Sequence, residues 1–253
     1  MKLLWQQIPS PLVSEILCQN EFFNGVVLDT EHGMFNNETI FSCIQVIKLS
    51  WKNAFVRVTE PNKTFVRQCL DAGADGIIFS TVETLEDCQK IIDITQITHQ
   101  KGSEISGCNC DGMVSGKRGL GLVRENKWGD SSTLGITESP YTIAQIETKK
   151  GLEKVEEMVS KFPIDGFFMG PYDLSMSLGC PGDFSDDRFQ KAVESFESAV
   201  PDEKRGIHIV KNLEENLEEN MYKYKKYRFL ALSMDTLMLK SRIKSIGRMI
   251  NAN

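Results

Sequence analysis

Short apolar runs recur along the chain, and the segments between them carry apolar residues at helical spacing. Turn-forming or polar residues bound each run, a pattern typical of strands buried on both faces of a parallel sheet. Eight runs fit this description, and they cover residues 3–7, 26–28, 54–58, 76–79, 141–146, 166–169, 206–210 and 229–233.

The intervening segments predict helices. Ile40, Ile44 and Ile47 follow the spacing of one helical face, and Gly73 marks a helix end before the fourth run. Eight alternating strands and helices predict a TIM-like (β/α)8 barrel that forms a single α/β domain over residues 1–253. A doubly wound open sheet remains the alternative, because strand order alone does not show closure.

Two further segments stand out. A long loop at about 97–140, with a glycine-rich polar tract at 102–135, separates the fourth and fifth runs; in a barrel it would lie on the active-site face as a lid or subunit contact. The stretch 214–228 mixes acidic and basic blocks with apolar residues at helical spacing, which predicts a solvated amphipathic helix. Another helix is expected at about 237–250.

Composition narrows the class of partner. A net charge of −6 argues against nucleic acid, because neutralising phosphates requires a dense basic surface. The sequence has neither an apolar stretch long enough to cross a membrane nor the pattern of a signal peptide, so no membrane is expected as a partner and a cytoplasmic location is predicted. The seven cysteines are expected to be reduced, and Cys108 and Cys110 lack the partners of a zinc site.

Acidic side chains follow two neighbouring runs. Glu147 comes directly after the fifth run and Asp173 shortly after the sixth. Ligands of parallel α/β folds bind at the carboxyl ends of the strands, where these two carboxylates would lie. Two carboxylates plus waters are a common protein contribution to a Mg²⁺ or Mn²⁺ site. The sequence therefore indicates a metal site here.

Other strand ends are also polar. The second run ends in Asp29-Thr30-Glu31-His32-Gly33, which Asp29 could close as a simple hydrogen-bonded turn. Arg57 lies inside the apolar third run and needs an anionic partner, either a structural carboxylate or a substrate. Asp71, taken alone, is typical of a solvated helix residue. In a barrel the strand ends face one pocket, which favours a shared chemical role.

Seven short motifs occur in a fixed order along the chain: Asp29-Thr30-Glu31-His32-Gly33, Val56-Arg57-Val58, Asp71-Ala72-Gly73-Ala74, Val82-Glu83-Thr84, Arg118-Gly119-Leu120-Gly121, Gln145-Ile146-Glu147-Thr148 and Gly170-Pro171-Tyr172-Asp173-Leu174-Ser175. Together these motifs resemble the HpcH/HpaI aldolase family from about residue 5 to 235. The resemblance implies a class II pyruvate aldolase (a carbon-carbon lyase) that reversibly cleaves a 4-hydroxy-2-oxo acid to pyruvate and an aldehyde through an enolate held on a divalent ion, Mg²⁺, Mn²⁺ or Co²⁺.

The resemblance also implies residue roles. By position, Glu147 and Asp173 match the metal ligands, and Gln145 and Trp5 match residues that contact the substrate. The backbone amides of Tyr172 and Asp173 match those that bind the pyruvate carboxylate, and Arg57 matches the arginine beside the enolate oxygen. His32 matches the catalytic base, and Asp71 matches the carboxylate that pairs with that base. A homo-oligomer, a hexamer in relatives, is implied as well, with the C-terminal helix exchanged between neighbours.

Departures from the family pattern leave other functions open. Ser80 stands where the family usually has proline, and the tract 97–117 looks longer than its counterpart, so the aldehyde preference is expected to differ. One alternative is another carbon-carbon lyase or condensing enzyme that uses a pyruvate or phosphoenolpyruvate enolate in biosynthesis. A second is a non-catalytic 2-oxo-acid binding protein. No strand end carries a lysine, which argues against imine-forming aldolases.

Overall fold

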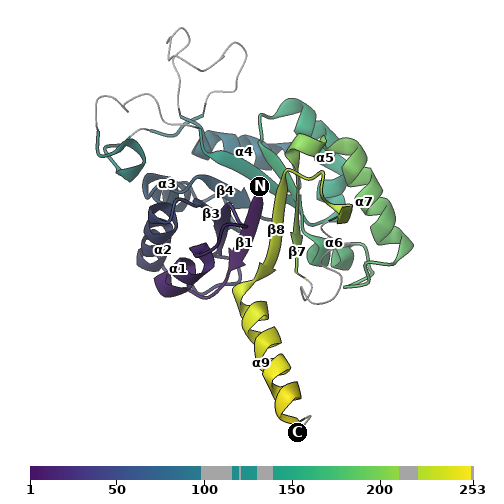
Figure 1. Ribbon diagram of the computed structural model, residues 1–253. Coiled ribbons are helices and arrows are strands. Elements are labelled where there is room, and N and C mark those ends of the chain that lie inside the picture. Colours follow the sequence, from purple (N-terminus) through teal and green to yellow (C-terminus); the bar gives the residue numbers. More distant parts are fainter. Residues whose placement is uncertain (98–115, 120, 130–138, 211–221, 252–253) are drawn as a thin grey trace.

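The strands of the protein form a closed parallel barrel. A computed structural model describes residues 1–97, 116–119, 121–129, 139–210 and 222–251 (Figure 1). Each strand pairs with its neighbours in chain order and β8 pairs with β1, which closes the sheet and excludes the open-sheet alternative. The strands are β1 (Lys2–Gln6), β2 (Gly25–Asp29), β3 (Asn53–Val58), β4 (Gly76–Phe79), β5 (Tyr141–Ile146), β6 (Gly166–Met169), β7 (Arg205–Ile209) and β8 (Phe229–Met234).

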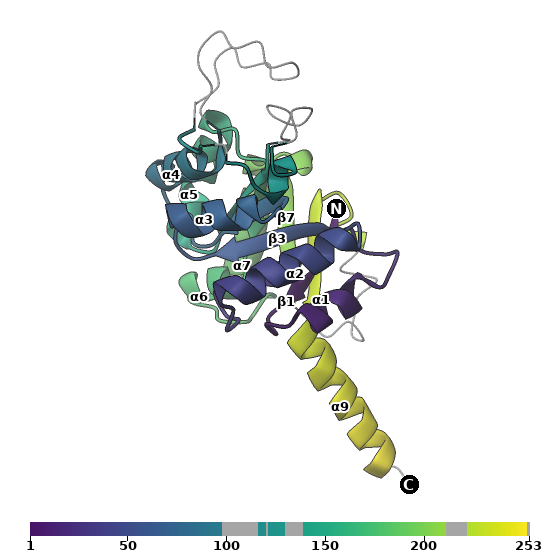
Figure 2. The ribbon, with the colours of Figure 1, turned by 90° about the vertical axis from the view of Figure 1, so that its left-hand side faces the viewer.

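Helices surround the barrel (Figures 1 and 2). Side-chain oxygens of Asn36, Asn62, Thr84, Thr148 and Asp186 accept hydrogen bonds from first-turn amides, which explains why five of the helices begin where they do. The helices are α1 (Pro11–Cys18), α2 (Asn37–Leu49), α3 (Lys63–Asp71), α4 (Leu85–Thr95), α5 (Lys149–Lys161), α6 (Pro171–Ser177), α7 (Asp187–Ala199) and α9 (Asp235–Asn251), with short 3-10 turns η1 (Arg124–Asn126) and η2 (Asp202–Lys204).

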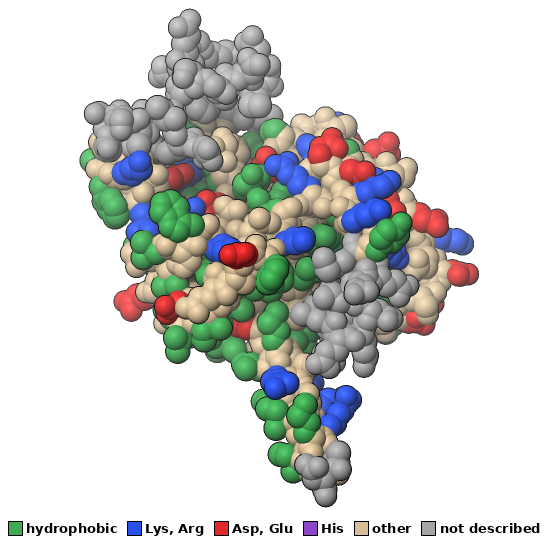
Figure 3. Space-filling model, in the orientation of Figure 1, with side chains coloured by type: hydrophobic (Ala, Val, Ile, Leu, Met, Phe, Trp, Pro, Cys, Tyr) green, Lys and Arg blue, Asp and Glu red, His purple; other side chains and the backbone are tan. Residues whose placement is uncertain are grey.

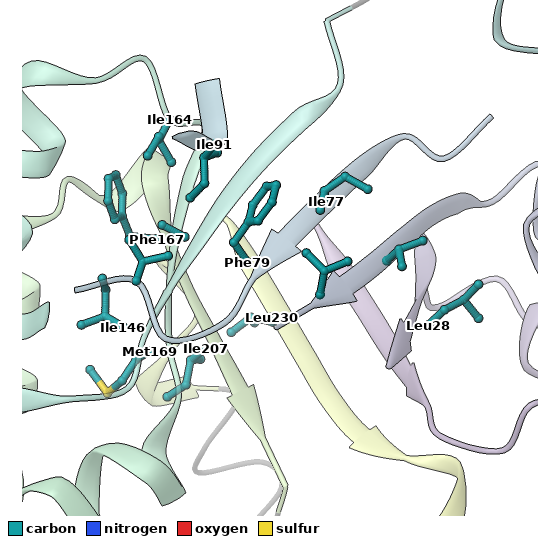
Figure 4. Packing of buried hydrophobic residues seen from close by; sticks show 14 of the residues in the cluster. Leu28, Ile77, Phe79, Ile91, Ile146, Ile164, Phe167, Met169, Ile207 and Leu230 are labelled. Carbon is teal, nitrogen blue, oxygen red and sulfur yellow. The ribbon is translucent and has the colours of Figure 1, made fainter. Parts of the chain in front are cut away.

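The period of two along each strand creates two separate cores. Outward side chains such as Leu28, Ile77 and Phe167 pack against the helices (Figure 4). Inward side chains such as Phe55 and Ile143 form a second cluster inside the barrel. A polar layer lies above this second cluster, because the next inward positions toward the strand ends are polar. The alternation therefore directs the polar residues of the strand ends into the barrel.

Aromatic rings and glycines on different strands fill the barrel interior. A Cβ atom on Gly76 would lie 2.6 Å from the ring of Phe55, so only glycine leaves room for that ring. The same relation holds for Gly206 with Phe168 and for Gly166 with Phe229, both at 2.8 Å. We call this layer the aromatic floor. It supports the polar residues that lie above it.

The predicted elements agree closely with the structure. Every predicted strand is present with bounds within one residue, and the predicted C-terminal helix is α9. Of the long loop, the described parts include η1 and a bridge between Ile97 and Arg118. Most of the helix predicted over 214–228, as well as Cys108 and Cys110, lies outside the described residues. Within the described ranges, no helix is long and apolar enough to cross a membrane.

Candidate active site

A cavity of about 240 Å³ opens at the carboxyl ends of the strands and collects most of the predicted site. Seven of the eight predicted residues line it, and only Asp71 does not. They come from β1, β3, β5, α6 and the loops after β2 and β5, as expected when strand ends converge on one face of a barrel. The seven are Trp5, His32, Arg57, Gln145, Glu147, Tyr172 and Asp173.

Glu147 is a buried carboxylate whose environment disfavours its charge. Its side chain accepts hydrogen bonds from the backbone amide of Thr81 at 3.0 Å and from the Thr81 hydroxyl at 3.1 Å. Burial raises the pKa of Glu147 to about 7; the negative charges of Asp173 and Glu31 add to this, whereas Arg57 and the Thr81 hydroxyl oppose it. A nearby cation would relieve this cost.

Thr81 holds Glu147 from an unusual backbone conformation. Its φ is +54°, in the left-handed region that a β-branched residue rarely adopts. Such strain is kept only where the surroundings determine the conformation, and it is often found at functional sites. Here the left-handed turn after β4 directs both donors of Thr81 at one carboxylate oxygen of Glu147.

The space around Glu147 fits a small bound ion. A Cβ atom on Gly170 would lie 2.6 Å from Cγ and Oε1 of Glu147, so glycine is required for the carboxylate to lie there. The Oε1 atom of Gln145 is buried without a partner among the described residues. Within the described ranges, no group of three or more His, Cys, Asp or Glu side chains is arranged for a metal. Glu147 and Asp173 would therefore bind an ion together with waters or substrate.

Asp173 and Tyr172 lie in the first turn of α6, directly after β6. Backbone amides at this place in a helix have no partner within the helix, so they are free to bind an anion such as a carboxylate. Both side chains are exposed at the cavity, with Tyr172 45% exposed, whereas Glu147 is only 3% exposed. The pair thus consists of one buried carboxylate and one exposed carboxylate.

Arg57 is held by carboxylates of the protein itself. Its Nε and Nη2 atoms each donate to Asp29 at 3.0 Å, and Nη1 lies 2.6 Å from Oε2 of Glu31. Of the two partners that the sequence left open, the structure supplies the structural carboxylate. The guanidinium carbon also lies 5.2 Å from the centroid of the Trp5 ring. Arg57 still lines the cavity, so its charge is fixed in place beside Glu147.

Asp29 organises this part of the site and is completely buried. It accepts hydrogen bonds from the indole of Trp5 at 2.9 Å, from the side chain of Gln7 at 3.2 Å, and from the backbone amide of His32 at 3.2 Å. Burial alone would raise its pKa, but the charge of Arg57 and these hydrogen bonds outweigh burial and hold the pKa below its ordinary value. The predicted role of Asp29 in a hydrogen-bonded turn is confirmed. Asp29 also binds the side chains of Trp5 and Arg57.

His32 and Asp71 are not brought together within one chain. His32 is exposed at the cavity. Asp71 ends α3, where an oxygen lies 3.4 Å from Nη2 of Arg118, a buried residue that also pairs with Glu125. The pairing of Asp71 with His32 thus stays a prediction, and among the described residues Asp71 forms an ion pair with Arg118 instead.

Sequence reasoning missed several residues of the cavity. Gln7, His208 and Met234 line it, and Thr81 holds Glu147. His208 could have been found, since it is one of only three histidines and lies at an inward position of a predicted strand. Thr81 could not, because neither its positive φ nor its contact with Glu147 leaves a mark in the sequence.

Comparisons with known proteins agree with this fold. A model of the HpcH/HpaI aldolase/citrate lyase family matches residues 3–239. A hydroxypyruvate/pyruvate aldolase of Roseobacter denitrificans is 27% identical over 247 residues, covering 96% of this chain and 90% of that protein. A 2-keto-3-deoxy-L-rhamnonate aldolase of Salmonella gallinarum is 26% identical over 196 residues, covering 76% of this chain and 67% of that protein.

Solved structures show the same fold. An HpcH/HpaI aldolase/citrate lyase family protein from Burkholderia cenocepacia superposes with a TM-score of 0.80 at 24% identity, covering 99% of this chain and 94% of that one. The citrate synthase SbnG superposes with a TM-score of 0.78 at 22% identity, covering 99% of this chain and 93% of that one.

The closed barrel and the aldolase relatives together place the protein among TIM-barrel enzymes of the aldolase and lyase kind. More particularly, the chain belongs to the HpcH/HpaI aldolase/citrate lyase family. Its aldolase relatives act on small molecules, as their names state.

Proposed function

We propose that the protein is a divalent-metal-dependent pyruvate aldolase that reversibly cleaves a 4-hydroxy-2-oxo acid to pyruvate and an aldehyde. One observation carries the proposal most strongly. A single cavity gathers a buried carboxylate with a raised pKa, a second carboxylate, a fixed arginine and a histidine. The aldolase names of the relatives support the same chemistry.

Glu147 and Asp173 would hold the ion. A divalent ion supplies Lewis acidity there, which favours negative charge on the keto oxygen of a 2-oxo acid. Arg57 adds a positive charge that Asp29 and Glu31 keep in place, so no side-chain reorganisation is needed when charge develops. The first-turn amides at Tyr172 and Asp173 would orient the substrate carboxylate.

His32 would move the proton of the 4-hydroxyl group. It is exposed at the cavity and not tied to a carboxylate of its own chain within the described residues, so it is accessible to substrate. During cleavage it would accept this proton, directly or through water, and during the reverse reaction return it. Gln145 and Trp5 would line the bound 2-oxo acid. Asp71 would serve as the partner of the base only across a subunit contact, because it does not meet His32 within one chain.

Deuterium exchange at C3 of pyruvate tests the proposal directly. The purified protein is incubated in D₂O with Mg²⁺, Mn²⁺ or Co²⁺, and exchange is followed by NMR before an aldehyde screen. We expect metal-dependent exchange that EDTA abolishes and that Glu147→Ala removes. Undiminished, EDTA-resistant activity in Glu147→Ala would refute the proposal. Turnover of another 2-oxo acid without any aldol product would instead favour a lyase or condensing enzyme on the same scaffold.

We further propose that the protein is a homo-oligomer, a hexamer by analogy with its family. Helix α9 extends away from the barrel and exposes Leu239, Ile243 and Met249 along its length (Figures 1 and 3). Exposed apolar side chains on a projecting helix favour contact with another subunit. Light scattering of the full chain tests this proposal, and a purely monomeric mass at micromolar concentration would refute it.

A further inference from the structure

His208 lies where the active-site cavity meets a second one. It occupies an inward position on β7, is 7% exposed, and lines the cavity that contains Glu147 and Asp173. It also lines a neighbouring cavity of about 430 Å³, whose wall includes Phe189 and Tyr224. A group attached to a bound 2-oxo acid, or an aldehyde approaching it, would pass this histidine.

The ring of His208 is fixed on two sides. It stacks on Trp5 with ring centroids 4.1 Å apart and an interplanar angle of 16°. Its Nε2 atom lies 3.2 Å from the carbonyl oxygen of Ser233. Ser233 adopts φ +57° at an irregularity in the pairing of β8 with β1, where the partner shifts by one residue between Leu3 and Trp5.

These contacts define which nitrogen of His208 carries the proton. A carbonyl oxygen can only accept a hydrogen bond, so Nε2 must be the donor. Burial lowers the pKa of His208 to about 4, so the ring is neutral near pH 7. A neutral imidazole with its proton on Nε2 has a bare lone pair on Nδ1. None of the described residues donates a hydrogen bond to it.

An acceptor of this kind selects for a donor on the ligand. Carboxylate and keto oxygens of a 2-oxo acid are acceptors and cannot satisfy it, whereas a hydroxyl group can. A bound substrate without the hydroxyl would displace water from Nδ1 and leave this acceptor without a partner, so it would bind less well. Resting on the proposed aldolase function, we propose that Nδ1 of His208 accepts a hydrogen bond from a substrate hydroxyl group and makes the enzyme prefer hydroxylated substrates.

The test compares substrates that differ by one hydroxyl group. One arm measures hydroxypyruvate against pyruvate with propionaldehyde as the common acceptor, and the other measures glycolaldehyde against acetaldehyde with pyruvate. The two arms distinguish a hydroxyl on the nucleophile from one on the aldehyde. The readout is the ratio of kcat/KM values within each arm, so a general loss of activity cancels.

Three variants of the full-length, Mn²⁺-loaded protein separate two functions of the His208 ring. One is the hydrogen-bond acceptor at Nδ1, and the other is the hydrogen bond from Nε2 to the Ser233 carbonyl. His208→Leu removes both functions of the ring. His208→Gln can still donate to the Ser233 carbonyl from the Nε2 side but has no acceptor at the place of Nδ1. His208→Asn offers an amide oxygen near that place. In one arm we expect the hydroxyl preference to fall roughly 10- to 100-fold in the Leu and Gln variants and to be largely kept in the Asn variant.

The outcomes distinguish this inference from the function on which it rests. Wild-type protein without pyruvate C3 exchange would overturn the proposed function and the inference together. Retained exchange, with equal ratios in wild type, Leu and Gln variants in both arms, overturns the role of His208 alone. A preference lost in the Leu variant but kept in the Gln variant also overturns it, because the effect would then come from anchoring at Ser233.

Discussion

Replacing Glu147 by glutamine is expected to stabilise the metal-free protein while it removes metal binding. The pKa of Glu147 is raised from 4.5 to about 7 in the folded state, chiefly by burial. Between these two values the folded protein holds a proton that the unfolded chain releases, so stability falls as pH rises through this window. Above it, the difference between the folded and unfolded pKa values corresponds to about 3 kcal/mol.

Glutamine has the shape of the protonated acid and carries no charge. At pH 8, Glu147→Gln is therefore expected to unfold at a higher temperature than wild type in EDTA, by roughly 6–12 °C for a domain of this size. At pH 5 the gain shrinks below about 1 kcal/mol, because wild-type Glu147 is then largely protonated when folded. Calorimetry in EDTA at both pH values measures this, and added Mn²⁺ is expected to stabilise only the wild type.

A matched control is Glu156→Gln, which removes an exposed carboxylate from α5, the same helix as Lys149. Its melting temperature is expected to follow that of wild type at both pH values. A Glu147→Gln variant that is less stable than wild type at pH 8, or equally stabilised at pH 5 and pH 8, contradicts the assignment of a buried, charge-disfavoured carboxylate.

Three other substitutions test the surroundings of the site. Thr81→Val removes the hydroxyl bonded to Glu147 and is expected to weaken Mn²⁺ binding roughly 10- to 100-fold by calorimetric titration. Gly170→Ala places a Cβ 2.6 Å from the Glu147 carboxylate and is expected to reduce metal-dependent exchange at least tenfold or so, with a stability loss of about 1–3 kcal/mol. Asp29→Asn removes the completely buried carboxylate that pairs with Arg57, leaves only the more exposed Glu31 beside that guanidinium among the described residues, and is expected to cost about 3–5 kcal/mol in urea unfolding. Since the pKa of Asp29 lies below 3.8, that difference is full above about pH 4 and shrinks only in stronger acid.

Each of these three substitutions has a matched control substitution. Thr81→Ser keeps the hydroxyl, so metal affinity near that of wild type is expected; equal affinities for Ser and Val variants contradict the role. Gly247→Ala adds a methyl group where, apart from the backbone of its own helix and its chain neighbours, none of the described atoms lies within 4 Å, and exchange should persist. Glu86→Gln breaks an exposed pair with Lys90, and urea stability should hardly change. An Asp29→Asn variant as stable as this control would contradict the buried network.

The fold was predictable because every strand combines a local apolar pattern with turn signals. The run at 76–79, for example, is entirely buried and begins at a glycine that an aromatic ring from the neighbouring strand requires. Closure was an inference from the number of strands. Only the pairing of β8 with β1 establishes it, and no local pattern contains that contact.

The site was predictable only in part. Residues at the ends of strands, such as Glu147 and Arg57, could be placed because a parallel barrel brings these ends together. The interaction partners of each residue could not be predicted. Asp29 binds Arg57 across 28 positions and Glu147 binds Thr81 across 66, and such contacts depend on strand register and side-chain direction. The sequence likewise did not indicate that Asp71 would lie beside Arg118.

The aromatic floor closes one end of the barrel, so the cavity is reached from the carboxyl ends of the strands. Glu147 lies deep, whereas Tyr172 stands 45% exposed at the rim. If the proposed function is right, pyruvate would bind before the aldehyde and would be released only after the aldehyde has dissociated. A bound aldehyde would also shield the carbanion from bulk water. The packing of phenylalanine against glycine would thereby set both the order of binding and the protection of the reactive intermediate.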